Sequence, residues 1–142
     1  MKKKIIIAFW WLLVSVCMGV IFYLSAQDGG ASEALSDEVK TVFGIPVAIN
    51  IIRKSAHFLE CAGLAFLVFN ALRATFGKSR PVAAFLITAA YAVSDEIHQL
   101  FVEGRACRIF DIFVDSCGAA SAILFMMFVF YVWEKRREYD RK

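Results

Sequence analysis

The sequence predicts an all-α, polytopic membrane protein, built as a bundle of four transmembrane helices with a short interfacial helix on its outer side. Apolar residues make up 60% of the 142 residues, and the mean hydropathy is +0.63. Soluble domains contain only about 45 to 50% apolar residues. The apolar residues also form four stretches, each long enough for a helix to cross the roughly 30 Å core of a bilayer. We expect residues 1–142 to form a single domain.

The first predicted span covers residues 5–24, which contain no charged residue. Because three lysines precede it, this segment also resembles a signal peptide. Its apolar run is longer than the roughly 7 to 15 residues of a signal peptide, and cleavage after Ala26 would put the bulky Leu24 where a small residue is preferred. We therefore expect a retained membrane anchor.

The other three predicted spans cover residues 49–72, 81–101 and 109–133, and each carries ionisable residues near one end. The second span holds its charged residues in its first half. The third is apolar until it reaches the polar sequence that begins at Ser94, and the fourth has two aspartates in its first turns. The charges thus lie at the same end of all three spans if successive helices are antiparallel.

The basic residues predict the orientation, because Lys and Arg in short loops mark the cytoplasmic side of a membrane protein. The two termini and the loop between the second and third spans hold eleven basic and three acidic residues. The remaining segments hold five basic and ten acidic residues. We therefore expect both termini in the cytoplasm and the polar ends of the spans at the outer face of a plasma membrane.

Between the first two spans, residues 32–43 are amphipathic at helical spacing. Ser32 can cap the start of a helix, and Gly44 with Pro46 can end it. We expect this segment to lie on the outer membrane surface. A solvated loop is the alternative, because the acidic charge of the segment does not favour anionic lipid.

Charged side chains inside a bilayer cost about 2.5 to 3.5 kcal/mol each on insertion scales, so they face other helices, form pairs or line a water-filled cavity. The helical period places Arg53, His57 and Glu60 on one stripe of the second span, with Lys54 beside it. These four residues are therefore expected to face the interior of the bundle.

The third span distributes its polar residues over several faces. Asp95 and Gln99 share one face, whereas Glu96 and His98 flank it on opposite sides, so they are expected to meet different neighbours. In the fourth span, two aspartates one turn apart project together. Since a short loop makes the third and fourth spans antiparallel, their polar ends share one membrane level with the first half of the second span.

The sequence therefore predicts an outward-facing polar site formed by the second, third and fourth spans. A buried salt-bridge network is the structural alternative, for example between Arg105 and Asp95, or between Lys54 and Asp111. Buried ion pairs are often neutral or costly relative to apolar packing, which argues against so many charges being present for stability alone.

Four short motifs in these segments resemble the VanZ-like family, and together they cover nearly the whole chain. They are FYLSAQ at residues 22–27, RKSAHFLE at residues 53–60, SDEIHQLF at residues 94–101, and Gly104-Arg105 followed by Asp111, Asp115 and Gly118. The chain departs from the family pattern at Cys61, Glu103 and Asp115, where an aromatic residue, a proline and an asparagine are frequent.

This resemblance implies a small multi-span protein of the bacterial cell membrane. The namesake of the family is associated with low-level resistance to the glycopeptide antibiotic teicoplanin, so the resemblance also implies a link to antibiotic resistance. Family resemblance does not by itself assign an activity.

The polar residues favour a membrane-embedded enzyme that acts at the outer leaflet on a lipid-linked or glycolipid substrate. Carboxyl groups in a low-dielectric site can exchange protons near neutral pH, and cationic side chains can hold a phosphate. The expected acid and base groups are Glu60, Asp95 and Glu96, with His57 and His98 as substitutes. The expected substrate-binding residues are Lys54, Gln99, Arg105, Asp111 and Asp115.

A non-catalytic protein that binds a lipid, a glycopeptide or a partner is the main alternative. A proton-coupled transporter is less favoured, because the inner halves of the spans are almost wholly apolar. Membrane lipids are the expected partners. The charge pattern does not suggest nucleic-acid binding, and the sequence does not predict an oligomeric state.

No cofactor is expected. Two histidines are present, and a divalent metal held by His57 and His98 with two carboxylates is the weaker alternative, because zinc accepts such ligands but the spacing matches no metal motif. The four cysteines form no metal or redox motif. A disulfide between Cys107 and Cys117 is disfavoured, because it would distort the first turn of the fourth span.

Overall fold

The computed structural model describes residues 1–27, 49–103, 105 and 108–141, and their regular structure is entirely helical. The helices are α1 (Lys2–Ser25), α3 (Ile49–Phe76), α4 (Pro81–Gln99) and α5 (Ile109–Tyr139). Each contains one of the predicted spans or nearly all of it, so the all-α prediction is confirmed for the described residues. The predicted interfacial helix at residues 32–43 lies outside the described residues, as does Cys107 of the disfavoured disulfide.

Three of the described helices are long and apolar enough to cross a membrane, namely α1, the Arg53–Phe76 part of α3, and α5. Helix α4 is shorter, with 19 residues, and its last turns are polar. The charged residues of α4 and its histidine all follow Val93, so they are confined to one end of this helix.

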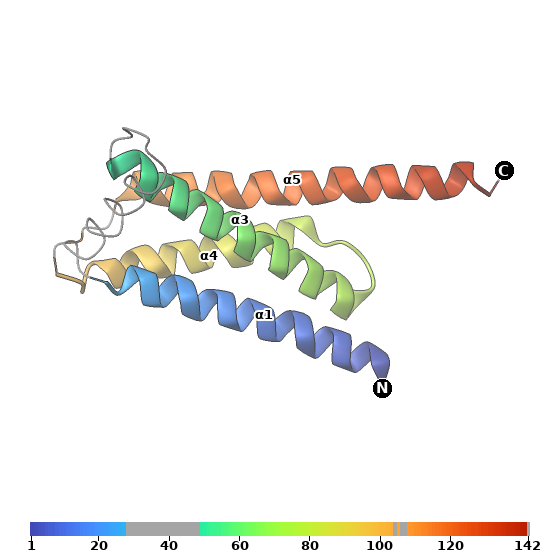
Figure 1. Cartoon of the computed structure of the whole chain (residues 1–142), viewed down its shortest axis with the longest axis horizontal. Coiled ribbons are helices and arrows are strands. Elements are labelled where there is room, and N and C mark those ends of the chain that lie inside the picture. Colours follow the sequence, from blue (N-terminus) through green and yellow to red (C-terminus); the bar gives the residue numbers. More distant parts are fainter. Residues whose placement is uncertain (28–48, 104, 106–107, 142) are drawn as a thin grey trace, which may run out of the picture.

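The helices lie alongside one another, and α3 packs against α1, α4 and α5 (Figure 1). The ends of α1 and α4 and the beginnings of α3 and α5 meet at one end of the bundle, on the left in Figure 1. Both chain termini lie at the opposite end, where α5 continues past the other helices. Because of this antiparallel arrangement, segments far apart in the sequence share one level of the bundle.

The centre of the bundle is apolar and is dominated by α3. Leu64, Ala65, Val68 and Phe69 are fully buried there, and they pack in one cluster with buried residues of the other three helices. Most large apolar side chains of α1 and α5 point outward instead, which is the pattern of a helix that faces lipid. This core holds α3 between its neighbours and so determines the level along the bundle at which its polar residues lie.

Helices α3 and α5 approach each other closely at Gly118. A Cβ atom at Gly118 would overlap the backbone carbonyl of Phe58. Small residues at helix interfaces allow such close backbone contact in membrane proteins. Since His57 precedes Phe58 and Asp115 lies one turn before Gly118, this contact also sets the spacing of two candidate site residues.

Side-chain hydrogen bonds attach α1 to the rest of the bundle. The indole Nε1 of Trp11 donates to Thr75 Oγ1 of α3 at 3.1 Å, and the hydroxyl of Tyr91 of α4 donates to the backbone carbonyl of Met18 at 2.6 Å. The first bond lies near the terminal end of the bundle and the second lies closer to the polar end. They position α1 so that its last turn reaches the polar residues of α4.

Local signals account for the tight connection between α3 and α4. Gly77 adopts a positive φ of 72°, and its N–H donates to the carbonyl of Arg73 at 2.8 Å. This is the usual way for a glycine to end a helix. Pro81 then occupies the first turn of α4, where its missing N–H costs nothing.

Candidate functional site

The candidate residues lie at the end of the bundle where the four helices meet. Three are on α3, four on α4, one in the following loop and two on α5. Six of the ten are buried, each with at most 7% of its surface exposed: His57, Asp95, Glu96, Gln99, Asp111 and Asp115. The structure thus gathers the central polar residues of three helices in the interior of the bundle, as the sequence predicts.

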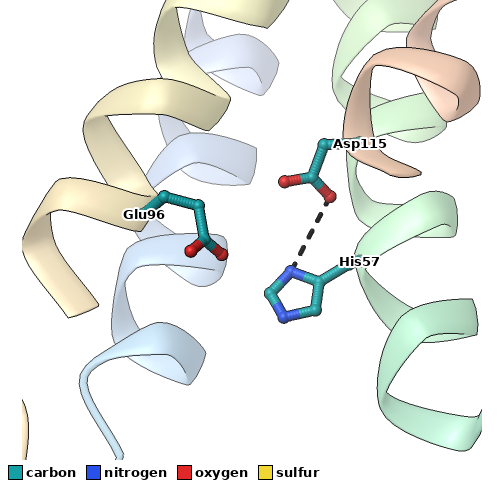
Figure 2. A group of neighbouring side chains, drawn as sticks. All are labelled: His57, Glu96 and Asp115. Carbon is teal, nitrogen blue, oxygen red and sulfur yellow. Dashed lines mark ion pairs between the residues drawn. The ribbon is translucent and has the colours of Figure 1, made fainter. Parts of the chain in front are cut away.

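His57, Glu96 and Asp115 form what we call the three-helix cluster, because they come from α3, α4 and α5 and point toward one another (Figure 2). One potential ligand atom from each side chain lies within 4.8 Å of the other two. The His57 Nδ1 atom is 3.7 Å from Asp115 Oδ1. This separation exceeds hydrogen-bond distance, so the two groups face each other without a direct hydrogen bond.

The carboxylates of the three-helix cluster retain free hydrogen-bonding capacity. Glu96 Oε2 accepts a hydrogen bond of 3.0 Å from the backbone N–H of Arg108, which orients the carboxylate. Glu96 Oε1 and Asp115 Oδ1 are buried and accept no hydrogen bond from the described residues, and the same holds for Asp111 Oδ1. Buried polar atoms of this kind usually have a partner, so the cluster has room for a proton or a ligand.

Asp95 has a separate environment between α4 and α1. Ser25 Oγ donates to Asp95 Oδ2 at 2.5 Å, and Gln99 Nε2 donates to the same oxygen at 3.1 Å and to Ser25 Oγ at 3.3 Å. We call these three residues the Ser25 triad. The sequence assigns the site to the second, third and fourth spans only, and the structure adds α1 through Ser25.

Arg105 spans the end of α1 instead of pairing with a carboxylate. Its Nε donates to the carbonyl of Gln27 at 2.9 Å, and its Nη2 donates to the carbonyl of Leu24 at 3.3 Å. Its Nη1 lies 3.5 Å from Gln99 Oε1. A cation is favourable at the carbonyl end of a helix. Burial lowers the pKa of the Arg105 guanidinium, yet an arginine remains charged at neutral pH.

His98, Lys54 and Glu60 lie around the three-helix cluster and the Ser25 triad. The ring of His98 stacks on Phe22 of α1, with centroids 4.1 Å apart, so the structure does not bring it into the three-helix cluster with His57. Lys54 Nζ lies 4.2 Å from the centroid of the Phe110 ring. Glu60 is partly buried. His98, Lys54 and Glu60 therefore border the buried centre.

The salt-bridge network considered from the sequence is not found. Within the described part of the chain, no Lys or Arg nitrogen lies within 4.0 Å of a carboxylate oxygen, and His57 with Asp115 is the pair that meets this distance. Among the described residues, the buried carboxylates therefore do not form the direct ion pairs with Lys or Arg that a structural salt-bridge network requires.

A shallow groove runs along the surface shared by α3 and α5 near this end of the bundle. It has a volume of about 510 Å³ and is lined by Ile51, Lys54, Ser55, Phe58, Leu59 and Val114. The lining is apolar except for Ser55 and the Lys54 ammonium, and that composition suits an acyl or prenyl chain that carries an anionic group.

Sequence reasoning misses Ser25 and the backbone groups around it as parts of the site. Ser25 is the last residue of α1, and antiparallel packing places it at the level of Asp95. A polar residue at the outer end of the first span is the signal that could have identified it. The Arg108 N–H and the carbonyls of Leu24 and Gln27 carry no such signal, because every residue has these groups.

Comparison with known proteins supports the resemblance seen in the motifs. The family described as VanZ/LLP1 matches residues 9–136, which is most of the chain. No curated protein and no solved structure matches the chain.

Proposed function

The chain belongs to the VanZ/LLP1 family, and we propose that it is a four-span enzyme of the bacterial plasma membrane that performs acid/base chemistry on a lipid-linked or glycolipid substrate at the outer leaflet. Family membership and three membrane-length apolar helices identify a membrane protein. The span count, the orientation and the chemistry are our proposal.

Helix α4 is the proposed fourth span. It lies beside the three apolar helices, and its charged residues lie at the end of the bundle opposite to both termini. At the terminal end, basic side chains cover aromatic rings, as in Arg73 with Phe130 at 3.4 Å and Arg137 with Trp133 at 4.6 Å. Such residues are typical of the cytoplasmic interface. This supports cytoplasmic termini and an outward-facing site.

The observation that carries the proposal is a set of buried carboxylates beside a histidine, with no Lys or Arg of the described residues in ion-pair distance of them. Each buried charge is costly in a membrane protein, and such residues commonly mark proton relays or substrate paths. A neutral imidazole next to two carboxyl groups can accept a proton from one group and pass it to another. The three-helix cluster is therefore the proposed centre of proton transfer.

In this proposal His57 and Glu96 exchange protons with the substrate, and Asp115 orients the His57 ring. Asp95, Glu60 and His98 are the proposed secondary acid and base groups. Lys54 would hold an anionic headgroup while the adjacent groove holds the lipid chain. Gln99, Arg105 and Asp111 would complete the substrate site.

The test is a lipid and cell-wall precursor analysis of cells that carry the wild-type protein, Asp95→Asn or Glu96→Gln. These changes are nearly isosteric and remove only the ionisable group. General acid/base groups contribute about 100-fold to 10,000-fold to a rate, so the product should fall to the level of cells without the protein. Glu134→Gln, an exposed change on α5, is the matched control and should leave the product unchanged.

Full product formation in both Asp95→Asn and Glu96→Gln would contradict the catalytic proposal. The same strains also test the link to antibiotics that family membership suggests. If the site contributes to teicoplanin resistance, Glu96→Gln should lower the inhibitory concentration of teicoplanin, whereas Glu134→Gln should not.

A non-catalytic protein that binds a lipid, a glycopeptide or a partner is the second candidate. The near-complete burial of Asp95, Glu96 and Asp115 favours it, because a substrate must reach these groups before they can react. The two candidates differ in one result. If the protein is an enzyme, Asp95→Asn and Glu96→Gln should abolish turnover. If it is a binding protein, these variants should still bind the ligand through the groove beside Lys54, and Lys54→Gln should lose it.

A further inference from the structure

The three-helix cluster contains the side-chain types that bind a divalent transition metal ion. An imidazole nitrogen and two carboxylate oxygens are common ligands of zinc, which binds them at about 2.0 to 2.2 Å. His57, Glu96 and Asp115 supply these atoms from three different helices, and all three side chains point into the same space (Figure 2).

The spacing of the ligand atoms is close to that of a metal site. A tetrahedral ion with bonds of about 2.0 to 2.2 Å holds its ligand atoms about 3.3 to 3.6 Å apart. His57 Nδ1 and Asp115 Oδ1 are 3.7 Å apart, and the three potential ligand atoms lie within 4.8 Å of one another. Closing a separation at this 4.8 Å limit would require a shift of about 1 Å on metal binding.

The unsatisfied atoms give an independent reason for a cation. Glu96 is fully buried with Oε1 unpartnered, and Asp115 is 3% exposed with Oδ1 unpartnered, as far as the described residues are concerned. Glu96 Oε2 is held by the Arg108 N–H, which leaves the other oxygen free in a fixed direction. Support of this kind from a neighbouring group is typical of a carboxylate that binds a metal.

The negative charge of the three-helix cluster also favours a bound cation. When both carboxylates are ionised and the imidazole is neutral, the cluster carries a charge of −2, and no described Lys or Arg nitrogen lies within 4.0 Å of either carboxylate. Asp111, which is buried nearby on α5, adds further negative charge. A divalent cation would neutralise this charge in a part of the molecule where an unpaired charge is costly.

We propose that His57, Glu96 and Asp115 together bind one divalent transition metal ion, of the class to which Zn²⁺ and Mn²⁺ belong. The histidine nitrogen disfavours Mg²⁺ and Ca²⁺, which prefer all-oxygen sites. His98, the partner of His57 in the metal site considered from the sequence, has no part in this one because it stacks on Phe22. Three protein ligands leave one position open, as in catalytic rather than structural zinc sites.

Metal content of the purified full-length protein tests this inference directly. The wild-type protein in nanodiscs is stripped with a chelator, dialysed against Zn²⁺ or Mn²⁺ in separate samples, and analysed for bound metal by mass spectrometry. We expect about one ion per chain with at least one of the two metals. Glu96→Gln and Asp115→Asn should each weaken binding at least 10-fold, because each removes one charged ligand.

Two variants serve as matched controls. His98→Gln removes the other histidine, and Glu134→Gln removes an exposed carboxylate at the far end of α5; both should bind metal as the wild type does. A bound ion should also raise the thermal unfolding midpoint of the wild type, which reports on binding even if a cluster variant folds poorly.

A wild-type protein that binds no metal and shows no thermal shift would overturn the inference. Equal loss on His98→Gln and His57→Gln would also overturn it in favour of the His57–His98 pairing. The inference does not depend on enzymatic activity, and a bound ion would replace His57 and Glu96 as free proton-exchanging groups, so metal binding is an alternative use of the same cluster. Metal binding without turnover would support the metal site and contradict the catalytic proposal. Turnover without bound metal would support the catalytic proposal and contradict the metal site.

Discussion

Ser25 supplies the buried Asp95 carboxylate with a hydrogen-bond donor from the neighbouring helix. Gln99 supplies a second donor to the same oxygen, whereas Asp95 Oδ1 accepts none from the described residues. Glu96, the next residue in the sequence, contacts α3 and α5 instead. The reason is that consecutive residues of a helix point about 100° apart, so two adjacent acids enter different environments.

Ser25→Ala tests the contribution of this hydrogen bond. Loss of one partner of a buried polar group typically costs about 1 to 3 kcal/mol, so the variant should unfold at a lower temperature in detergent. Ser94→Ala is the control, because Ser94 is exposed and its hydroxyl donates to the carbonyl of Tyr91 on its own helix. Equal midpoints for the two variants would show that the Ser25 triad adds no stability.

The contact between α3 and α5 determines whether the three-helix cluster forms. Gly118 allows the α5 backbone to approach the Phe58 carbonyl, and the neighbouring His57 and Asp115 are thereby brought to 3.7 Å. The amphipathic pattern of each helix predicts that its polar residues face inward. It does not predict this separation, which depends on how closely the two backbones pack.

Gly118→Ala should separate α3 from α5 and destabilise the protein. Overpacking of this kind typically costs about 1 to 3 kcal/mol, and the wider spacing should also weaken metal binding by the three-helix cluster. Gly63→Ala is a matched control on α3, because a Cβ there meets no atom within 4 Å. Since alanine favours a helix over glycine, Gly63→Ala should leave the unfolding midpoint unchanged or raise it. A midpoint for Gly118→Ala equal to that of the wild type would contradict the close-packing argument.

The molecule as a whole is polarised along its long axis. Buried carboxylates, both histidines and Arg105 lie at one end, whereas the termini, Arg73 and Arg137 lie at the other. The apolar core separates the two ends. In the proposed orientation, with α4 as the fourth span, the polar end is the outer face and the terminal end is the cytoplasmic face.

Reporter fusions test this orientation. Alkaline phosphatase is active only outside the cytoplasm. Green fluorescent protein fluoresces in the cytoplasm but not after export through the general secretion route. Fusions at Gly77 and at the C-terminus should fluoresce and lack phosphatase activity, and fusions at Glu103 should show the opposite. An active phosphatase at Gly77 would reverse the orientation and place the site at the cytoplasmic face.

The sequence predicts the positions of the helices well, because the length and hydropathy of each apolar stretch are local properties. It also predicts that His57, Glu96 and Asp115 lie at the same level, since antiparallel connections align the polar ends of the spans. It places His98 on a different side of its helix from Glu96 but does not identify its neighbour, which is the ring of Phe22. Stacking between two helices depends on their rotation, which no local pattern specifies.

Hydrophobic length and charge placement in the sequence alone therefore determine the helical class, the membrane character and the depth of the polar residues. Only the packing of the helices decides that Asp95 pairs with Ser25, that Arg105 binds the end of α1, and that an imidazole and two carboxylates face one another. The physical reason is that such contacts depend on the rotation and close approach of whole helices, which are set by interlocking side chains distant in the sequence.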